Sequence, residues 1–424
     1  MRNSSAQGSL LCILVALVVI ISINILRLEG VDARSNKTLS IKVEKVGTDY
    51  GGSTPPFYVV NLPIGSPNQT TMRLKLDLDS PETIVNCSNE LVASSLTLHK
   101  LKCRDKRSRK SKKTLEGCEV EDSVWLNELR GNVSDPIVPV PVRKVNFRCG
   151  TGGNAGDGVA GFSAADSSSL PAQVSKNGRG IGKRFSYCLP SIAYFGSPDV
   201  YTKAQLISIS FGAFRYVQIT HFQSNQFQRT PLIIKKKKKK KNGPEPEHRY
   251  AISVHNMSVG GGSWVGSLNL SKPIELFIST TQLYTSLETS TYVAFRDMFR
   301  HAIGPAPPLD PVAPFDTCYS ANTFFDRYGT QHPLPVGPIL SLDLAGGATW
   351  TVSAPKYFVR PSSQPGIACF GFVDAGPDKP NVLGTFQQED SLLEFDVARS
   401  TLAFRRIYEP DTSERFLTGC RHLV

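Results

Sequence analysis

Apolar and polar residues alternate with a period of two along much of this chain, which is the pattern of half-buried β-strands. Gly and Pro, with 34 and 29 residues among the 424, supply turns between the alternating segments. The alternation is found in residues 57–62, 72–77, 136–148, 206–211, 250–259, 348–352 and 392–404. The pattern therefore predicts an all-β chain.

Helix signals are few and short. Ser167–Ser175 begins with serine caps and has Pro171 near its first turn. Thr289–Ala302 begins with Thr and Ser caps and carries Val293, Met298 and Phe299 toward one predicted face. We expect a few short helices beside the strands.

The N-terminal segment has the features of a secretory signal. Arg2 precedes an apolar run, Leu10–Leu26, and Val31-Asp32-Ala33 fits a small-residue cleavage site. We expect residues 1–33 to be a signal peptide, with an uncleaved membrane anchor as the alternative. In both cases the remaining chain enters the secretory lumen.

The cysteines agree with that compartment. Cys12 lies in the signal segment, which leaves eight of the nine cysteines, and an even number in an oxidising environment predicts four disulfides. Their spacing lacks the Cys and His pattern of zinc sites, so we expect neither a metal nor another cofactor. The eight are Cys87, Cys103, Cys118, Cys149, Cys188, Cys318, Cys369 and Cys420.

Sequons for N-glycosylation occur six times, and in a lumenal chain they predict a glycoprotein. The asparagines are Asn36, Asn68, Asn86, Asn132, Asn256 and Asn269.

The formal net charge of +12 comes from two local runs. Lys100–Lys113 holds nine Lys and Arg against Asp105, Lys235–Lys241 is seven lysines, and the other residues sum to a small negative charge. This distribution argues against a nucleic-acid-binding face. We expect Ser94–Glu121 to be a solvated or poorly ordered insertion. For the lysine run we expect a flexible hairpin tip, with a sequence artefact and a polyanion-binding tip as alternatives.

An internal duplication is the most informative feature. One apolar strand ends in Leu76–Ser80 and resumes at Ile84; a second, Leu276–Ile278, ends in Ser279-Thr280-Thr281 and resumes at Tyr284. Each is followed at a distance by an apolar segment containing glycine, Gly158–Phe162 and Val382–Phe386. The repeat predicts two lobes that face each other across a cleft.

With these elements in this order, the chain resembles the pepsin-like aspartic protease family, from about Tyr58 to Cys420. It is most similar to the plant extracellular branch, which contains nepenthesin-like proteases, basic seven-S globulin, dermal glycoproteins and TAXI-type xylanase inhibitors. The stretches that carry the resemblance are Phe185–Leu189, Ile252–Gly260, Phe315–Tyr319, Val382–Phe404 and Phe416–Cys420. The resemblance implies a bilobal pepsin-like fold, with an N-terminal lobe over 34–200 and a C-terminal lobe over 201–424.

The family's chemistry needs two carboxylates that share one proton and activate one water. Asp77 stands at the first position of the family's Asp-Thr/Ser-Gly motif, but Asp79 replaces its glycine. In the second lobe Ser279 stands where the catalytic Asp is needed and Thr281 where the glycine is needed. A serine cannot share the proton of the pair, so we expect no catalytic residue, only the degenerate positions Asp77 and Ser279.

The resemblance then implies a secreted, non-enzymatic glycoprotein of the plant cell wall, or apoplast. We expect an inhibitor or binder of glycoside hydrolases of the xylanase or endoglucanase class. Xylanase inhibitors of the branch have a His before their Phe-Thr-Gly-Cys ending, where this chain has Phe416. The alternatives are a wall-associated or storage-like binding glycoprotein, which could hold acidic polysaccharide, and an active aspartic endopeptidase.

Two disulfide pairs are predicted. Cys318–Cys369 remains once the other cysteines are placed in the first half or at the terminus, and Cys188–Cys420 would tie the C-terminus back. The four other cysteines, Cys87, Cys103, Cys118 and Cys149, can pair in three ways, which the sequence leaves open.

Overall fold

The computed structural model describes most of Lys37–Val424, and its many strands and few short helices confirm the predicted all-β class. The predicted signal segment, residues 1–33, lies outside the described residues. Within the described part of the chain, no helix is both long and apolar enough to cross a membrane. The described residues are 37–47, 55–87, 95–103, 115–129, 138–150, 157–164, 167–196, 207–211, 214–218, 227–236, 248–261, 264–324, 337–407 and 420.

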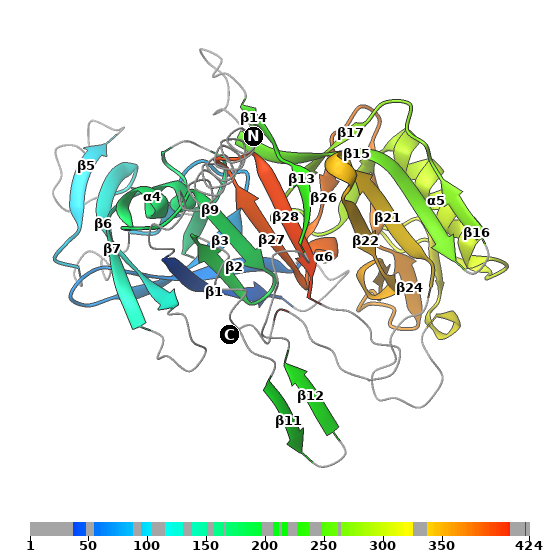
Figure 1. The fold of residues 1–424 in the computed structure, drawn as a ribbon, viewed down its shortest axis with the longest axis horizontal. Helices are drawn as coiled ribbons and strands as arrows, with labels where there is room; N and C mark the ends of the chain where they lie inside the picture. The colour runs from blue at the N-terminus through cyan, green and yellow to red at the C-terminus, as the bar shows by residue number, and fades with distance from the viewer. Residues whose placement is uncertain are drawn as a thin grey trace, which may run out of the picture. The chain divides into compact units, whose positions relative to one another are not determined.

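A 13-stranded sheet contains strands from both halves of the sequence, in the order β13-β28-β27-β9-β10-β1-β2-β3-β8-β4-β7-β6-β5. Figure 1 shows its early strands in blue and cyan and its last two in red. The strands are β1 (Thr38–Val46), β2 (Phe57–Ile64), β3 (Thr70–Asp77), β4 (Ile84–Val85), β5 (His99–Cys103), β6 (Cys118–Leu129), β7 (Val138–Cys149), β8 (Gly158–Gly161), β9 (Arg184–Cys188), β10 (Ile192–Phe195), β13 (Gln228–Pro231), β27 (Ser391–Asp396) and β28 (Thr401–Arg406).

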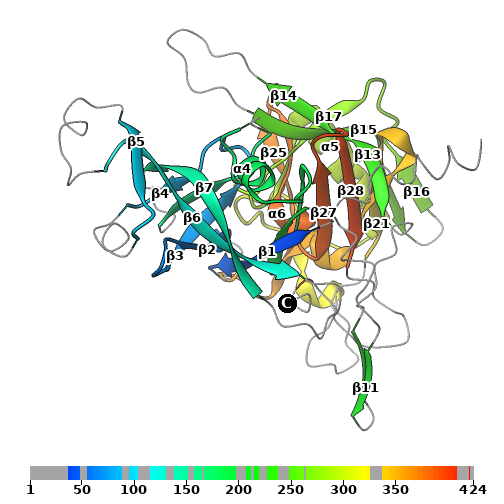
Figure 2. The same cartoon turned by 60° about the vertical axis from the view of Figure 1, so that its left-hand side comes forward.

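A nine-stranded sheet and a four-stranded sheet form most of the second half, and Figure 2 labels β14, β15, β16, β17, β21 and β25 of the nine-stranded sheet. The nine strands are β14 (Ile233–Lys236), β15 (His248–Gly261), β16 (Trp264–Ser267), β17 (Ile274–Ile278), β18 (Thr285–Glu288), β21 (Ile339–Leu344), β22 (Thr349–Val352), β25 (Phe372–Gly376) and β26 (Asn381–Leu383). The four are β19 (Pro308–Leu309), β20 (Cys318–Ser320), β23 (Phe358–Val359) and β24 (Ile367–Phe370), and β11 (Ile207–Phe211) pairs with β12 (Phe214–Gln218).

The described residues of the strongly alternating segments lie on strands, as predicted, apart from Ala348 and the turn at 397–400. They fall on β2, β3, β7, β11, β15, β22 and the β27–β28 hairpin. In β3, for example, Met72, Leu74 and Leu76 are buried while Thr71 and Arg73 are exposed, because successive side chains point to opposite faces.

The helices are α4 (Leu170–Asn177), α5 (Thr289–Ile303) and α6 (Thr385–Gln388), so both predicted helices form. The Glu288 carboxylate caps α5 by accepting from the N–H groups of Ser290 and Thr291. The buried face of α5 carries Tyr292, Phe295 and Phe299. The prediction for Val293 was wrong, since this side chain is 36% exposed. The aromatic positions, at helical spacing, determine which side of α5 packs against β15 and β25.

The expectation of a solvated insertion at Ser94–Glu121 was wrong for its described residues. β5 and the start of β6 lie in it, and Leu115 and Val120 are buried. β5 is the edge strand of the large sheet, and His99 and the lysines on it are exposed. Charged side chains are typical of edge strands, because they oppose pairing with other chains. The lysines of β5 therefore made this strand resemble a solvated segment. Residues 104–114 lie outside the described residues.

The lysine run also begins in a strand. Lys235 and Lys236 belong to β14, which pairs with β15, and the Lys235 ammonium lies 2.7 Å from a Glu275 carboxylate oxygen. These two residues are therefore not at a hairpin tip, in contrast to the prediction. Residues 237–241 lie outside the described residues.

Four disulfides link the eight cysteines, and they include the two pairs proposed from the sequence. Cys318–Cys369 joins β20 to β24, and Cys188–Cys420 joins β9 to the C-terminal segment over 232 positions of sequence. In the first half, where three pairings were open, the structure has Cys87–Cys149 and Cys103–Cys118.

Peptide mapping without reduction is expected to recover these four pairs from the purified protein. The diagnostic species is a peptide pair joining Cys103 to Cys118, because neither of the other two pairings of the first half contains it. A peptide joining Cys87 to Cys103 or Cys118 would contradict this arrangement.

A buried network of charges connects the two halves. The Glu389 carboxylate, after α6, accepts from the Lys45 ammonium of β1 at 2.7 Å, from the Lys356 ammonium at 3.3 Å and from the Tyr58 hydroxyl of β2. Lys356 also donates to the Asp390 carboxylate at 2.7 Å. Burial opposes the charged form of Glu389, but the Lys356 and Lys45 charges outweigh it and lower the pKa of Glu389 to about 2. Both charges of the central Lys356–Glu389 pair are thereby compensated inside the protein.

Replacing Glu389 by Gln is expected to lower the free energy of unfolding by about 3 kcal/mol at pH 7, because Lys45 and Lys356 lose a buried partner. The folded pKa is depressed, so this stabilisation is present above the unfolded pKa of about 4.5 and is lost as the pH falls toward 2. Urea unfolding of wild type and Glu389→Gln at pH 7, 4 and 2.5 would measure both effects.

The exposed pair of Glu275 with Lys235 offers a matched control. Glu275→Gln is expected to cost less than about 1 kcal/mol, since exposed ion pairs contribute little. An equal loss in the two variants, or a Glu389→Gln effect that does not shrink in acid, would contradict the role of the buried network.

Candidate functional site

Two strand-loop-strand elements, one from each half, have the same pairing. In the first, β8 runs parallel to β3, with Asp77 opposite Gly161, and antiparallel to β4. In the second, β26 runs parallel to β17, with Ile278 opposite Leu383, and pairs antiparallel with β18. The loops after β3 and β17, which carry Asp77 and Ser279, are therefore structural counterparts.

A glycine follows or ends the inserted strand in each element because the backbone is crowded there. A Cβ atom on Gly161 would lie 2.4 Å from the carbonyl oxygen of Glu82, and one on Gly384 would lie 2.3 Å from the backbone carbon of Tyr284. Both contacts are with backbone atoms, which cannot move aside easily. These are the glycines of the two apolar segments singled out in the sequence.

Thr280 joins the two loops directly. Its hydroxyl donates to the Leu76 carbonyl at 2.8 Å and accepts from the Leu78 N–H at 3.1 Å, across more than 200 positions of sequence. Thr280 and Leu78 are both buried. Because Leu78 has no hydroxyl, it cannot make the reciprocal contact, and the link is one-sided.

Asp77 is held within its own loop. One of its carboxylate oxygens accepts from the N–H groups of Asp79 at 2.8 Å and Ser80 at 3.2 Å. Burial raises the pKa of Asp77, these N–H bonds oppose that rise, and the nearby charge of Asp79 adds to it. Within the described residues, this carboxylate has no carboxyl group as a hydrogen-bond partner.

Asp79 is the residue that contacts the opposite loop. Its carboxylate accepts from Arg249 Nε of β15 at 3.1 Å and from the Ser279 hydroxyl at 3.3 Å. The Arg249 guanidinium also lies over the Phe277 ring, 4.6 Å from its centroid. Ser279 in turn accepts from the Thr281 N–H at 3.2 Å. The centre thus holds an ion pair that a serine hydroxyl supports.

Asp79 and Thr281 stand where the family has glycine, and their side chains do not keep the two loops apart. The loops meet, because the Asp79 side chain extends to the cation of Arg249 and the hydroxyl of Ser279. Arg249 was not singled out in the sequence. It lies in a strand of the second half, 170 positions from Asp79, and no local motif marks it.

Three of the predicted glycosylation sites, Asn68, Asn86 and Asn269, are exposed. Asn256 is partly buried, and its side-chain nitrogen donates to Asp343 at 3.0 Å. Asn36 and Asn132 lie outside the described residues. A search of the described part of the chain finds no cluster of His, Cys, Asp and Glu able to hold a metal ion.

Comparison with known families gives two matches, one in each half. Residues 58–197 match the xylanase inhibitor N-terminal family, and residues 249–406 match the xylanase inhibitor C-terminal family. Among individual proteins, gamma conglutin 1 of Prunus dulcis is 26% identical over 78% of this chain and 79% of its own length. A probable aspartic proteinase, GIP2 of Nicotiana benthamiana, is 29% identical over 56% of this chain and 53% of its own length.

Solved structures support the same fold. Edgp superposes with a TM-score of 0.65 at 21% identity, covering 88% of this chain and 95% of that one. Conglutin gamma from lupine seeds, described as a basic 7S globulin, superposes with a TM-score of 0.62 at 21% identity, over 87% and 94%. The chain therefore belongs to the xylanase-inhibitor and basic 7S globulin branch of the pepsin-like fold family.

Proposed function

We propose that this protein is a catalytically inactive, pepsin-like secreted glycoprotein that binds and inhibits glycoside hydrolases of the cell wall. The observation that carries the proposal is the Asp79–Arg249 ion pair with its Ser279 hydrogen bond, located where the two loops meet. An aspartic protease needs two carboxylates sharing one proton at this place.

Ser279 is the proposed replacement of the second catalytic aspartate. It follows β17 as Asp77 follows β3, and its hydroxyl does not ionise in the physiological pH range. Asp79 contributes a carboxylate, but the guanidinium of Arg249 keeps that carboxylate in an ion pair instead of leaving it to share a proton with Asp77. Without a shared proton, no water is activated by the family mechanism.

Hydrolase binding is supported by the descriptions of the two matching families, which name xylanase inhibitors. Xylanases and endoglucanases are the partner class we propose. We further propose residues 34–200 and 201–424 as the two lobes, residues 1–33 as a cleaved signal and the apoplast as the location. The sequons at exposed asparagines and the four disulfides fit a lumenal chain.

Some relatives have names that suggest a different function. The conglutin and globulin relatives favour a storage-like or wall-associated binding protein, and the one named a probable aspartic proteinase favours an endopeptidase. Peptidase and hydrolase-binding measurements separate the three functions.

The purified protein is expected to show no pepstatin-sensitive cleavage of denatured protein between pH 3 and 7. Asp77→Asn serves as the matched variant, because it removes the remaining carboxylate that a family-type mechanism would need. Equal background rates in the two proteins agree with inactivity. Cleavage that pepstatin blocks and Asp77→Asn abolishes would overturn the proposal.

Ser279→Asp is expected to remain inactive and to lower the free energy of unfolding by about 1–2 kcal/mol. The new carboxylate would lie beside Asp79, compete for Arg249 and remove a hydroxyl donor. Ser279→Ala, the control, loses only the hydrogen bonds and should cost about 1 kcal/mol. Chemical unfolding at pH 7 compares the three proteins, and a gain of acid peptidase activity in Ser279→Asp would contradict the interpretation.

Recombinant protein immobilised through a C-terminal tag is expected to retain fungal or bacterial xylanase or endoglucanase from a defined mixture of purified enzymes and to reduce its activity. Binding that persists at 0.5 M salt would agree with a packed interface, whereas binding through exposed charges weakens steeply with salt. Retention of acidic pectin alone would favour the wall-associated alternative.

A further inference from the structure

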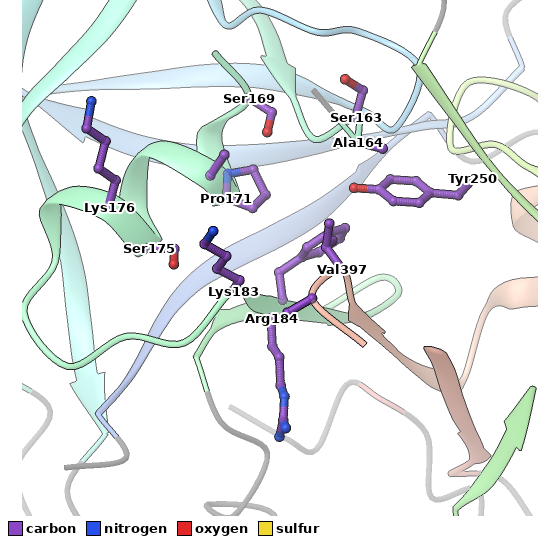
Figure 3. Close-up of a pocket in the computed structure, with 13 residues that line it drawn as sticks. Ser163, Ala164, Ser169, Pro171, Ser175, Lys176, Lys183, Arg184, Tyr250 and Val397 are labelled. Atoms are coloured by element: carbon purple, nitrogen blue, oxygen red, sulfur yellow. The ribbon is translucent and has the colours of Figure 1, made fainter. Parts of the chain in front are cut away.

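A cavity of about 650 Å³ lies between α4, the start of β9, Tyr250 of β15 and the turn after β27 (Figure 3). These four elements are distant in sequence or belong to different sheets, since Tyr250 belongs to the nine-stranded sheet while β9 and β27 belong to the large sheet. Cavities that hold small organic ligands have volumes of about 300–1,000 Å³ and favour such junctions. The residues at the centre described above, Asp77, Asp79 and Ser279, do not line it.

Much of the cavity wall is apolar or aromatic. Pro171 and Ala172 of α4 lie on one side and Val397 on another, with Phe185 among the lining residues. Phe185 is stacked on Phe395 with ring centroids 4.7 Å apart. The wall at Phe185 is therefore a fixed aromatic surface, suited to a flat apolar ligand.

Tyr250 presents a polar group to this surface. Its side chain is 1% exposed, and Figure 3 shows its hydroxyl directed toward the cavity and the side of Ser163. Within the described residues, the Tyr250 hydroxyl has no hydrogen-bond partner. Burial raises the pKa of Tyr250, so the hydroxyl stays protonated and can donate. The hydroxyl faces the cavity and has no acceptor among the described residues, so a ligand oxygen placed there accepts its hydrogen.

The cavity also contains a cation that is not neutralised by the described residues. Lys183 lines it, is exposed, and forms no ion pair within the described chain. Arg184 is different, because its guanidinium Nε lies 2.7 Å from an Asp396 carboxylate oxygen. The Ser175 hydroxyl is also occupied, since it donates to the Ile181 carbonyl. Lys176, in the last turn of α4, also lines the cavity, is exposed and forms no ion pair within the described chain. Lys183, Lys176 and Tyr250 are thus the polar groups left to recognise a ligand.

We propose that this cavity binds a small aromatic carboxylate. Its ring lies against Phe185, Pro171 and Val397, a carboxylate oxygen accepts the hydrogen of the Tyr250 hydroxyl, and Lys183 balances the negative charge. A neutral sugar would leave Lys183 unused and would place hydroxyls against apolar walls. Inorganic phosphate would leave the aromatic and apolar walls uncovered. The site is independent of the proposed hydrolase binding.

The test uses the full chain and two fluorescent probes of equal shape, 2-naphthoate and the uncharged 2-naphthalenemethanol, in fluorescence titration at low salt. We expect saturable binding of naphthoate and about two- to fivefold weaker binding of the alcohol, because an exposed lysine contributes modestly. Lys183→Gln should reduce this difference, and Lys183→Gln combined with Lys176→Gln should remove it. Lys272→Gln, at an exposed lysine away from the cavity lining, should preserve it.

Two further variants locate the site. Tyr250→Phe removes only the hydroxyl and should weaken naphthoate binding about five- to tenfold, the effect of one lost hydrogen bond. Ala172→Phe places a ring in the cavity and should abolish binding. Each variant is first compared with wild type by thermal unfolding, and Tyr250→Phe should unfold at nearly the wild-type temperature.

Three results would overturn the proposal. They are equal affinities for naphthoate and the alcohol, naphthoate binding unchanged by Tyr250→Phe, and naphthoate binding undiminished by Ala172→Phe in a folded protein. Absence of saturable naphthoate binding by the wild-type chain would also overturn it.

Discussion

The central contact between the two halves is the pair of hydrogen bonds made by one hydroxyl. Thr280 donates to the Leu76 carbonyl and accepts from the Leu78 N–H, so the ends of β17 and β3 are fixed side by side in a buried place. The same two loops also meet through the Asp79 side chain. Asp79 reaches Ser279 and Arg249 only because the two loops are held at this separation.

Because the Thr280 hydroxyl bonds to backbone groups of the other loop, the fold does not require a particular set of charged side chains between the loops. The glycines at 161 and 384 and the Thr280 contact are requirements of backbone packing, and they do not depend on a catalytic carboxylate pair. Two ionised carboxylates at close range repel each other and need a shared proton. Here the Asp79 carboxylate has the guanidinium of Arg249 as counterion and the Ser279 hydroxyl as donor, and the Asp77 carboxylate accepts from the N–H groups of its own loop. The buried Glu389 network follows the same logic, with Lys45 and Lys356 as counterions.

Much of the fold could be predicted from the sequence, because period-two alternation and paired glycine segments are local signals. The internal duplication predicted the two loops that carry Asp77 and Ser279. The sequence did not predict contacts between side chains that are distant along the chain. Arg249 carries no motif that assigns it to Asp79, and the exposed lysines of β5 resemble a solvated loop although they lie on an edge strand. Val293 was misassigned for a related reason, since Tyr292, Phe295 and Phe299 together determine the buried face of α5.

Two neighbouring residues of β15 contribute to two different sites, the contact between the Asp79 and Ser279 loops and the cavity. Side chains of adjacent strand residues point to opposite faces, so Arg249 reaches Asp79 while Tyr250 packs near Phe395, with ring centroids 4.9 Å apart, and lines the cavity. The same segment of β15 therefore supplies Arg249, which pairs with Asp79, and the Tyr250 hydroxyl, which has no partner among the described residues. Since the Tyr250 hydroxyl takes no part in holding the loops together, a ligand can bind to it without disturbing the contact between Arg249 and Asp79. The two sites are adjacent in sequence but differ in chemistry, because Arg249 is held in an ion pair with Asp79 whereas the Tyr250 hydroxyl faces the cavity.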